Sequence, residues 1–417
     1  MNIYPLKGVK VVDLTIFISG PGSSKILADW GADVIKVESP TGDPNRTVGR
    51  TIGMPIDEDC NPFFAAFNMN KRDIVLDLKK PEAKIILEKM LAEADVFVSN
   101  FRPAALERLD LDYASVHARH PHLIWASING FGNFGPEKNA PGFDTVAYWA
   151  HSGLQLDMCE AGEDGPSPLI PFLGVGDTGT AITLAGAIGT ALYGREKTGE
   201  GCQVFASLLG QAIWNASCSV MSSQYSDSYP KTRKKPNIPM INSYKTKDGE
   251  WIFTSVFDDK TYPRYLRAIG RDDLADDERY NNPVGAKQNA EELTEIFDKI
   301  FATFTYEAIC KRLIEFDIAY SRISPVSSNA TDPQALANNN VFNYVHRDGS
   351  SSVIPMPPVA FGDNIDTQIK YHYPRQGEHT NDVLRELGYS EQEIQAFIDN
   401  GAAAVHEKSK AEALGGV

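Results

Sequence analysis

One carboxylate in this chain stands in a setting suited to acyl-transfer chemistry. Asp177 is flanked by three glycines, Gly174, Gly176 and Gly179. Glycines leave room for a large ligand and let free backbone amides face it. The Ala- and Gly-rich stretch that follows, to about Tyr193, predicts a helix, and a helix N-terminus favours negative charge. We therefore expect Asp177 to be ionised at pH 7.

An ionised carboxylate can attack a thioester carbonyl without a general base. The backbone N–H groups of the glycine turn would then hold the developing oxyanion, and each such donor is worth about 3 kcal/mol of transition-state stabilisation. A second interpretation is structural, because aspartate is among the best residues for capping a helix N-terminus. The segment alone does not separate an Asp177 nucleophile from an Asp177 cap.

The composition is that of an ordinary folded protein. The 417 residues are 42% hydrophobic and 23% charged, which disfavours a disordered chain. No apolar run of about 18 residues predicts a membrane span. The formal net charge of -15 disfavours general nucleic-acid binding, so neither nucleic acid nor a membrane is expected as a partner. An anionic ligand would need a locally basic or amide-rich site.

The cysteines and histidines predict no metal site. Five cysteines are scattered and never form a CxxC pair, and the eight histidines show no ligand spacing with them or with one another. An odd number of dispersed cysteines also disfavours a disulfide framework. The first residues lack the basic and apolar regions of a signal peptide. These features predict a cytoplasmic protein.

Short β-branched runs alternate with amphipathic stretches in the first part of the chain. Strands are predicted at 9–14, 33–37, 74–78, 95–98 and 123–128, with helices at 20–30 and 81–92 among them. This alternation predicts an α/β fold with a Rossmann-like, open and mostly parallel sheet. The first strand-to-helix loop lacks the GxGxxG spacing, which disfavours a nicotinamide or flavin dehydrogenase.

Shifts in composition predict two domains. We expect the first part of a large domain over 1–221 and a linker rich in Ser, Tyr, Lys and Pro over 222–240. A smaller mixed α/β domain is predicted over 241–325, with a strand at 251–256 and a helix at 290–304. Residues 326–417 are predicted to form a second linker and a return to the large domain.

Short blocks along nearly the whole chain resemble one enzyme family. They lie, in the family's order, at 6–15, 20–21, 27–38, 42–43, 68–79, 94–108, 130–132, 176–177, 197–201 and 377–380. On these blocks the sequence resembles the class III coenzyme A (CoA) transferases, the family of formyl-CoA transferase and carnitine CoA-transferase. The resemblance is specific for the family and says little about the substrate.

The resemblance implies a mechanism and an assembly. Asp177 would attack a donor acyl-CoA, form a mixed anhydride and release CoA thiolate, and the exchange would continue through an aspartyl-CoA thioester. The substrates would be an acyl-CoA and a carboxylic acid, with no permanently bound cofactor. The subunit would have two domains and form an interlocked homodimer.

The resemblance also implies a CoA site, made of Ile18, Ser19, Leu76, Lys79, Asn100, Phe101, Arg108, Phe143 and Asp144. Pantetheine would enter near Ile18 and Ser19, and Arg108 would reach a phosphate. Asp144 is either a second functional carboxylate near the pantetheine channel or a structural partner for a buried donor.

Two positions depart from the family's pattern. Ser39 stands where formyl-CoA transferase has an arginine, and Pro141 stands where it has a lysine. Other cations must therefore meet the phosphates, with Lys71, Arg72 and Arg102 as candidates.

Two other functions remain open. The related α-methylacyl-CoA racemases need a histidine in a G-H-D run as a second acid/base, but this chain has phenylalanine at that position, Phe143. His151 is the only candidate to replace that histidine. A CoA-binding scaffold without activity is the second alternative, although a scaffold has no need for the aspartate nucleophile.

The runs at 141–153 and 243–251 resemble transferases for (R)-2-hydroxy acids such as phenyllactate and 2-hydroxyisocaproate. Three aromatic side chains, Phe143, Tyr148 and Trp149, would suit a branched or aromatic acyl chain, or would belong to the core. Bile-acid, carnitine-type and dicarboxylate transferases are the alternatives.

Overall fold

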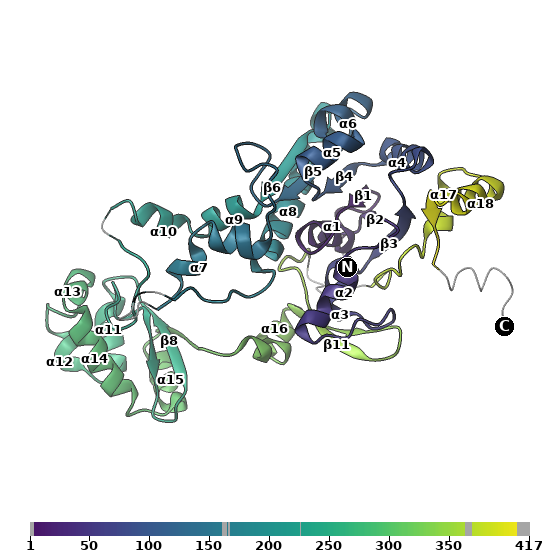
Figure 1. Ribbon diagram of the computed structural model, residues 1–417. Helices are drawn as coiled ribbons and strands as arrows, with labels where there is room; N and C mark the ends of the chain where they lie inside the picture. The colour runs from purple at the N-terminus through teal and green to yellow at the C-terminus, as the bar shows by residue number, and fades with distance from the viewer. Residues whose placement is uncertain (1–3, 161–164, 166, 226, 363–368, 407–417) are drawn as a thin grey trace. The chain divides into compact units, whose positions relative to one another are not determined.

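The computed structural model describes residues 4–160, 165, 167–225, 227–362 and 369–406 (Figure 1). The chain divides into two compact units. One comprises Met1–Leu154, Pro171–Ser217 and Ala330–Val417, and the other comprises Gln155–Ile170 and Cys218–Asn329. Each unit has its own sheet and its own hydrophobic core.

The first unit is built on a seven-stranded sheet with the strand order β12-β3-β2-β1-β4-β5-β6. Six strands are parallel: β1 (Lys10–Leu14), β2 (Asp33–Glu38), β3 (Lys71–Leu76), β4 (Val96–Ser99), β5 (Ile124–Asn129) and β6 (Gln203–Ser207). The short strand β12 (Ala403–Ala404) pairs antiparallel with β3. The prediction of an α/β fold with an open, mostly parallel sheet is confirmed.

Neighbouring residues of β1 pack into different cores. Val11 lies in a cluster with α1 (Ser19–Asp29) and α8 (Val175–Thr198), whereas Val12 lies in a cluster with α4 (Pro81–Glu93). Such alternation is expected of a strand that is buried on both faces. Helices therefore cover both faces of the sheet.

The order of the strands reverses at β1. The chain passes from β1 to β2 and β3 on one side, and then crosses to β4, β5 and β6 on the other side. In open parallel sheets, ligands bind beyond the carboxyl ends of the strands at such a switch point. The loops that follow β1 and β4 are therefore the expected place for a site.

The remaining elements of the first unit surround this sheet. They are α2 (Asn45–Val48), η1 (Gly49–Ile52), α3 (Pro62–Asn68), α5 (Pro103–Leu109), α6 (Tyr113–Arg119), η2 (Asp144–Ala150), α9 (Leu208–Asn215), α16 (Pro333–Ala337), β10 (Val341–Val345), β11 (Ser351–Pro355), α17 (Thr380–Glu386) and α18 (Glu391–Asp399). The short elements α7 (Leu154–Asp157), α10 (Ser217–Ser222) and η3 (Val326–Ala330) lie where the chain changes units.

The second unit has a three-stranded antiparallel sheet of β7 (Asn242–Lys245), β8 (Trp251–Ser255) and β9 (Ala319–Arg322). Its helices are α11 (Thr261–Ala268), α12 (Asp272–Ala275), α13 (Pro283–Gln288), α14 (Ala290–Phe301) and α15 (Tyr306–Glu315). Beyond the predicted 241–325, this unit also takes in 155–170 and 218–240. One contact between these added segments is the backbone N–H of Arg233, which donates to Glu160 at 3.1 Å.

Among the described residues, none of the helices combines the length and the apolar character needed to cross a bilayer.

Candidate active site

A cavity of about 670 Å³ opens at the carboxyl edge of the large sheet. The loops that follow β1, β4 and β5 all contribute to its wall, as the strand order leads one to expect. Helix α8 precedes β6 and runs opposite to the strands, so its N-terminus lies at the same edge. Asp177 lines the cavity from the first turn of α8.

The glycine turn before Asp177 has a conformation and a packing that require glycine. Gly174 is the N-cap of α8 and has a φ of 81°, in the left-handed region. At Gly176, a Cβ atom would lie 2.2 Å from Cγ of Tyr148, so no side chain fits there. Since Gly174 is the cap, the interpretation of Asp177 as the helix cap is wrong.

Asp144 binds the glycine turn through its carboxylate. Its Oδ1 accepts the N–H of Gly176 at 2.7 Å and that of Asp177 at 3.2 Å, and its Oδ2 accepts the N–H of Gly174 at 3.1 Å. The Asp144 side chain is buried, at 3% exposed, and also lines the cavity. Of its two predicted roles, the structural partner of buried donors is the one these hydrogen bonds match.

The same hydrogen bonds correct the predicted oxyanion site. The amides of Gly174 and Gly176 already donate to Asp144, so they are not free to hold a developing oxyanion. Gly179 lies further along α8, where N–H groups bond to carbonyls one turn earlier. Gly176 instead serves close packing, and Gly174 serves the tight turn.

The environment of Asp177 changes its charge. Burial, and to a smaller extent the Asp144 carboxylate, raise the pKa of Asp177 to about 7, against the opposing effect of the Ser19 side chain. Burial also raises the pKa of Asp144, against the effect of its three amide donors. At pH 7 Asp177 is therefore only partly ionised, and not fully ionised as expected, because lost hydration and a neighbouring carboxylate outweigh the helix N-terminus.

The structure gathers most of the predicted CoA-site residues around one cavity. Its lining includes Ile18, Ser19, Asn100, Phe101, Arg108, Phe143 and Asp144. Leu76 and Lys79 lie outside this lining: Leu76 is 1% exposed in the core at the end of β3, and Lys79 is exposed beyond that strand. Their contact with adenine stays a prediction.

Three cations line the cavity: Arg102, Arg108 and Lys138. None of them forms an ion pair within the described part of the chain. The side chain of Asn139 accepts the N–H of Ala104 at 3.0 Å, which joins the loop of Lys138 to the start of α5. The cavity therefore has a cationic region around α5.

The other two candidates for the phosphate contacts are wrong. Lys71 is fully buried and pairs with Asp13 at 2.9 Å. Arg72 pairs with Asp33 at 2.7 Å and with Glu386 at 2.8 Å. Sequence reasoning missed Lys138, although a Lys-Asn pair in the long loop after a parallel strand was an available signal.

The residues proposed for other chemistry, apart from Phe143, lie outside the cavity lining. His151 is outside the cavity lining, with Nδ1 3.6 Å from Glu137 Oε2 and its ring against Phe131. Tyr148 and Trp149 are buried in a cluster with α9, so they belong to the core. Phe143 does reach the cavity, where its ring meets that of Phe17 edge-on at 5.4 Å. Within the described residues, no group of three His, Cys, Asp or Glu side chains is placed to hold a metal.

Comparison with known proteins gives one consistent family. The model for CoA-transferase family III matches residues 6–380. The chain is 36% identical to an (R)-2-hydroxy-4-methylpentanoate CoA-transferase of Clostridioides difficile, over 95% of this chain and 98% of that protein. It is 35% identical to a cinnamoyl-CoA:phenyllactate CoA-transferase of Clostridium sporogenes, over 94% of this chain and 96% of that protein.

A solved structure shares the fold. The crystal structure of a CAIB/BAIF family protein from Brucella suis matches with a TM-score of 0.75 and 28% sequence identity. The match covers 93% of this chain and all of that chain.

Replacing Asp144 with asparagine should shift the acid side of the pH–activity profile to lower pH. An Asp177 nucleophile would attack in its ionised form, so the rate should rise with pH through its pKa of about 7. Removing the neighbouring negative charge lowers that pKa, and the acid side of the profile should move about one pH unit lower. Asparagine keeps one oxygen acceptor for the glycine turn.

The measurement is kcat/KM for acyl-CoA between pH 5 and 9. Glu107→Gln, which removes an exposed charge on α5, should leave the acid side of the profile in place. If the fall of kcat/KM at low pH occurs at the same pH in Asp144→Asn as in the wild-type enzyme, the charge of Asp144 does not raise the pKa of Asp177.

Proposed function

Because this chain belongs to CoA-transferase family III, we propose that Asp177 is the nucleophile through which it transfers CoA from an acyl-CoA to a 2-hydroxy acid. The carboxylate oxygen attacks the thioester carbon, the C–S bond breaks, and CoA thiolate leaves behind a mixed anhydride. The thiolate then attacks the Asp177 carbonyl, which releases the donor acid and leaves an aspartyl-CoA thioester. The acceptor carboxylate repeats the two steps in reverse order.

One observation carries this proposal: Asp177 and three unpaired cations line the same cavity. The whole chain has a formal net charge of -15, so three cations with no carboxylate beside them in this part of the cavity lining are a specific feature. CoA has the matching distribution, with phosphates at one end and the reacting sulfur at the other. Binding energy from the phosphate end can offset the cost of forming an anhydride at Asp177.

The raised pKa of Asp177 suits this chemistry. Close to pH 7 a large fraction of Asp177 is ionised, and a carboxylate of higher basicity is a better nucleophile than an ordinary one. The same burial keeps water from a reactive anhydride. The carboxylate needs no base, and the absence of His151 from the cavity lining removes support for the racemase alternative.

The 2-hydroxy acid is proposed from two relatives and from the cavity wall. The two bacterial relatives are named for 2-hydroxy acids, one with a branched aliphatic side chain and one with an aromatic side chain. Here the edge-on rings of Phe17 and Phe143 give the cavity an apolar surface, with Leu173 also in the lining. An apolar wall favours such side chains over the second carboxylate of a dicarboxylic acid.

A homodimer is proposed as the working form. Helices α8 and α9 expose large apolar side chains, among them Tyr193 at 66% and Trp214 at 76%. Exposed apolar side chains of this size are typical of protein–protein interfaces when they gather into a patch.

A cytoplasmic location also stays a proposal, supported by five free cysteines.

Replacing Asp177 with asparagine should abolish transfer. The amide has nearly the same shape but cannot form the anhydride, so the turnover rate should fall by at least about 10³-fold. Mass spectrometry of the intact wild-type protein, incubated with acyl-CoA alone, should show a covalent adduct that the variant lacks. Tight CoA binding without an adduct on the wild-type protein would favour the scaffold alternative.

Replacing Arg102 or Lys138 with alanine should weaken acyl-CoA binding. Loss of one charge-assisted contact of about 1.4 kcal/mol raises KM for acyl-CoA about tenfold with a smaller effect on kcat. The effect should shrink as salt is added. Lys84→Ala, which removes an exposed cation of α4 outside this cavity, is the matched control.

Replacing Phe143 with alanine should change the preference among acceptor acids. With a panel of 2-hydroxy, dicarboxylic and sterol acids, the wild-type enzyme should prefer 2-hydroxy acids with bulky apolar side chains. The variant should lose about tenfold in kcat/KM for these acids relative to lactate, because the loss is confined to side-chain contacts. A wild-type preference for a sterol or a dicarboxylate would overturn the choice of substrate and leave the family intact.

A further inference from the structure

The loop between β1 and α1 is held by four side chains from other segments: Lys36, Asp43, Asn45 and Asn100. Lys36 Nζ donates to the carbonyl of Thr15 at 2.8 Å. The side chain of Asn100 binds Ile16 twice, accepting its N–H at 2.9 Å and donating to its carbonyl at 2.6 Å. The backbone of this loop therefore owes its conformation to side-chain partners and not to a helix or strand.

Phe17 is the unusual residue of the loop. Its φ is 66°, in the left-handed region that bulky residues rarely adopt. Asp43 Oδ1 accepts the N–H of Phe17 at 3.0 Å, and the side-chain amide of Asn45 donates to its carbonyl. An unfavourable backbone conformation persists where the surroundings hold it from several sides.

Three side chains of this region reach the site: Ser19 beside Asp177, Ile18 against Gly174, and Phe17 in the cavity wall. Ser19 and Asp177 line the same cavity, and the Ser19 side chain lies near enough to lower the pKa of Asp177. The Ile18 side chain reaches within 3.4 Å of the place where a Cβ of Gly174 would lie. The Phe17 ring meets Phe143 across the cavity wall. A change in the backbone at Phe17 would move all three contacts, because they follow it directly in the chain.

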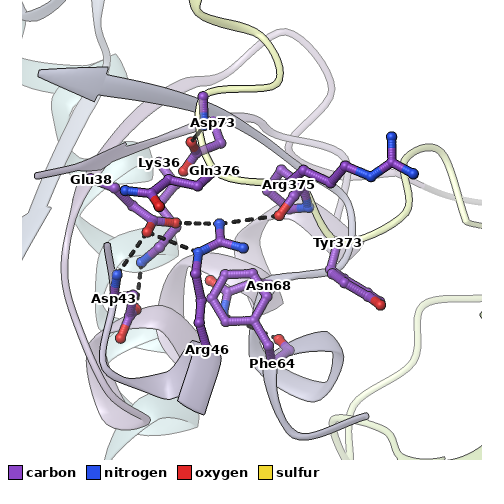
Figure 2. A network of polar contacts seen from close by, with 12 residues as sticks. Lys36, Glu38, Asp43, Arg46, Phe64, Asn68, Asp73, Tyr373, Arg375 and Gln376 are labelled. Carbon is purple, nitrogen blue, oxygen red and sulfur yellow. Dashed lines mark hydrogen bonds and ion pairs between the residues drawn. The ribbon is translucent and has the colours of Figure 1, made fainter. Parts of the chain in front are cut away.

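Lys36 and Asp43 bind the backbone of the loop and do not line the cavity. Both side chains are fully buried, at 0% exposed, and they pair at 2.9 Å (Figure 2). The pair is itself anchored: Glu38 accepts the N–H of Asp43 at 2.7 Å and binds Arg46 through both of its oxygens. A buried pair of this kind has one geometry, since either charge alone would be costly.

We propose that Lys36 and Asp43 are positioning residues for acyl transfer, which hold Phe17 in its left-handed conformation and so place Ser19 against Asp177. This inference rests on the proposed role of Asp177. The pair acts through the backbone of the loop, since Asp43 is absent from the groups that change the charge of Asp177. Its other charged neighbours, Asp13, Glu38 and Arg46, also lie outside the cavity lining.

The test is a double-mutant cycle between Asp43→Asn and Phe17→Gly, measured on the full-length enzyme with acyl-CoA. Asp43→Asn should lower kcat about 10²-fold and change KM for acyl-CoA less than about threefold, as expected when a catalytic group is misplaced. Glycine adopts positive φ freely, so in the Phe17→Gly background Asp43→Asn should cost less than about fivefold in kcat. If Asp43→Asn lowers kcat by the same factor in the wild-type and the Phe17→Gly enzymes, the proposal is overturned.

A matched control separates positioning from stability. Asp29→Asn breaks the buried pair of Lys25 and Asp29 in α1, which touches neither the loop nor the cavity. It should lower the unfolding temperature comparably and leave kcat unchanged, whereas an equal loss of kcat in both variants would overturn the proposal. If Asp43→Asn does not fold, Asn45→Ala removes the side-chain hydrogen bond to the Phe17 carbonyl. Because Asn45 also lines the cavity, this variant is judged on its non-additivity with Phe17→Gly, which should match that expected for Asp43→Asn.

The outcomes remain distinguishable from failure of the proposed function. Turnover that survives Asp177→Asn would reject the nucleophile, whatever Asp43→Asn does. Loss of turnover in Asp177→Asn together with an unchanged kcat in Asp43→Asn would reject the positioning pair alone.

Discussion

The carboxylate of Asp144 organises this site, because three backbone amides at the start of α8 converge on it. It sets the shape of the glycine turn and so the direction from which Asp177 enters the cavity. It also places a negative charge next to Asp177, which helps to keep that group basic at neutral pH. One buried side chain thus determines both the geometry and the reactivity of the proposed nucleophile, and the glycines are needed because Tyr148 and Asp144 press so closely on the turn.

The sheet explains why these groups meet where they do. Reversal of the strand order at β1 separates the loops after β1 and β4 and opens a space between them at the carboxyl edge. The loop after β1 contributes Ile18 and Ser19, and the loop after β4 contributes Asn100, which ties the two loops together through Ile16. Charge then divides the cavity, with the carboxylates at the start of α8 and the cations around α5.

Much of the fold was predictable from the sequence, because hydrophobic alternation is a local signal. The strands around Val11 and Val34, and the helix at 290–301, follow directly from it. The resemblance to the family also predicted Ser19, Asn100 and Arg108 as site residues, and all three line the cavity. What the sequence left open or missed depends on distant contacts. Asp144 lies thirty residues before the turn it binds, so its two predicted roles could not be separated. Lys71 sits in a charged run that looks exposed, but in the fold it is buried and pairs with Asp13 of β1. Neither the pKa of Asp177 nor the occupied amides of its turn have a signature in a single sequence.

The pair of neighbouring carboxylates has a consequence for the sequence of events in the proposed reaction. A free carboxylate approaching the resting site meets Asp144 and the ionised fraction of Asp177 in a poorly hydrated space, so its entry is disfavoured. Once Asp177 has become an acyl or thioester group, one of those charges is gone and the acceptor can approach. In the proposed reaction the acyl-CoA donor therefore reacts before the acceptor acid binds. Free acid that accumulates competes poorly with acyl-CoA for the unoccupied enzyme.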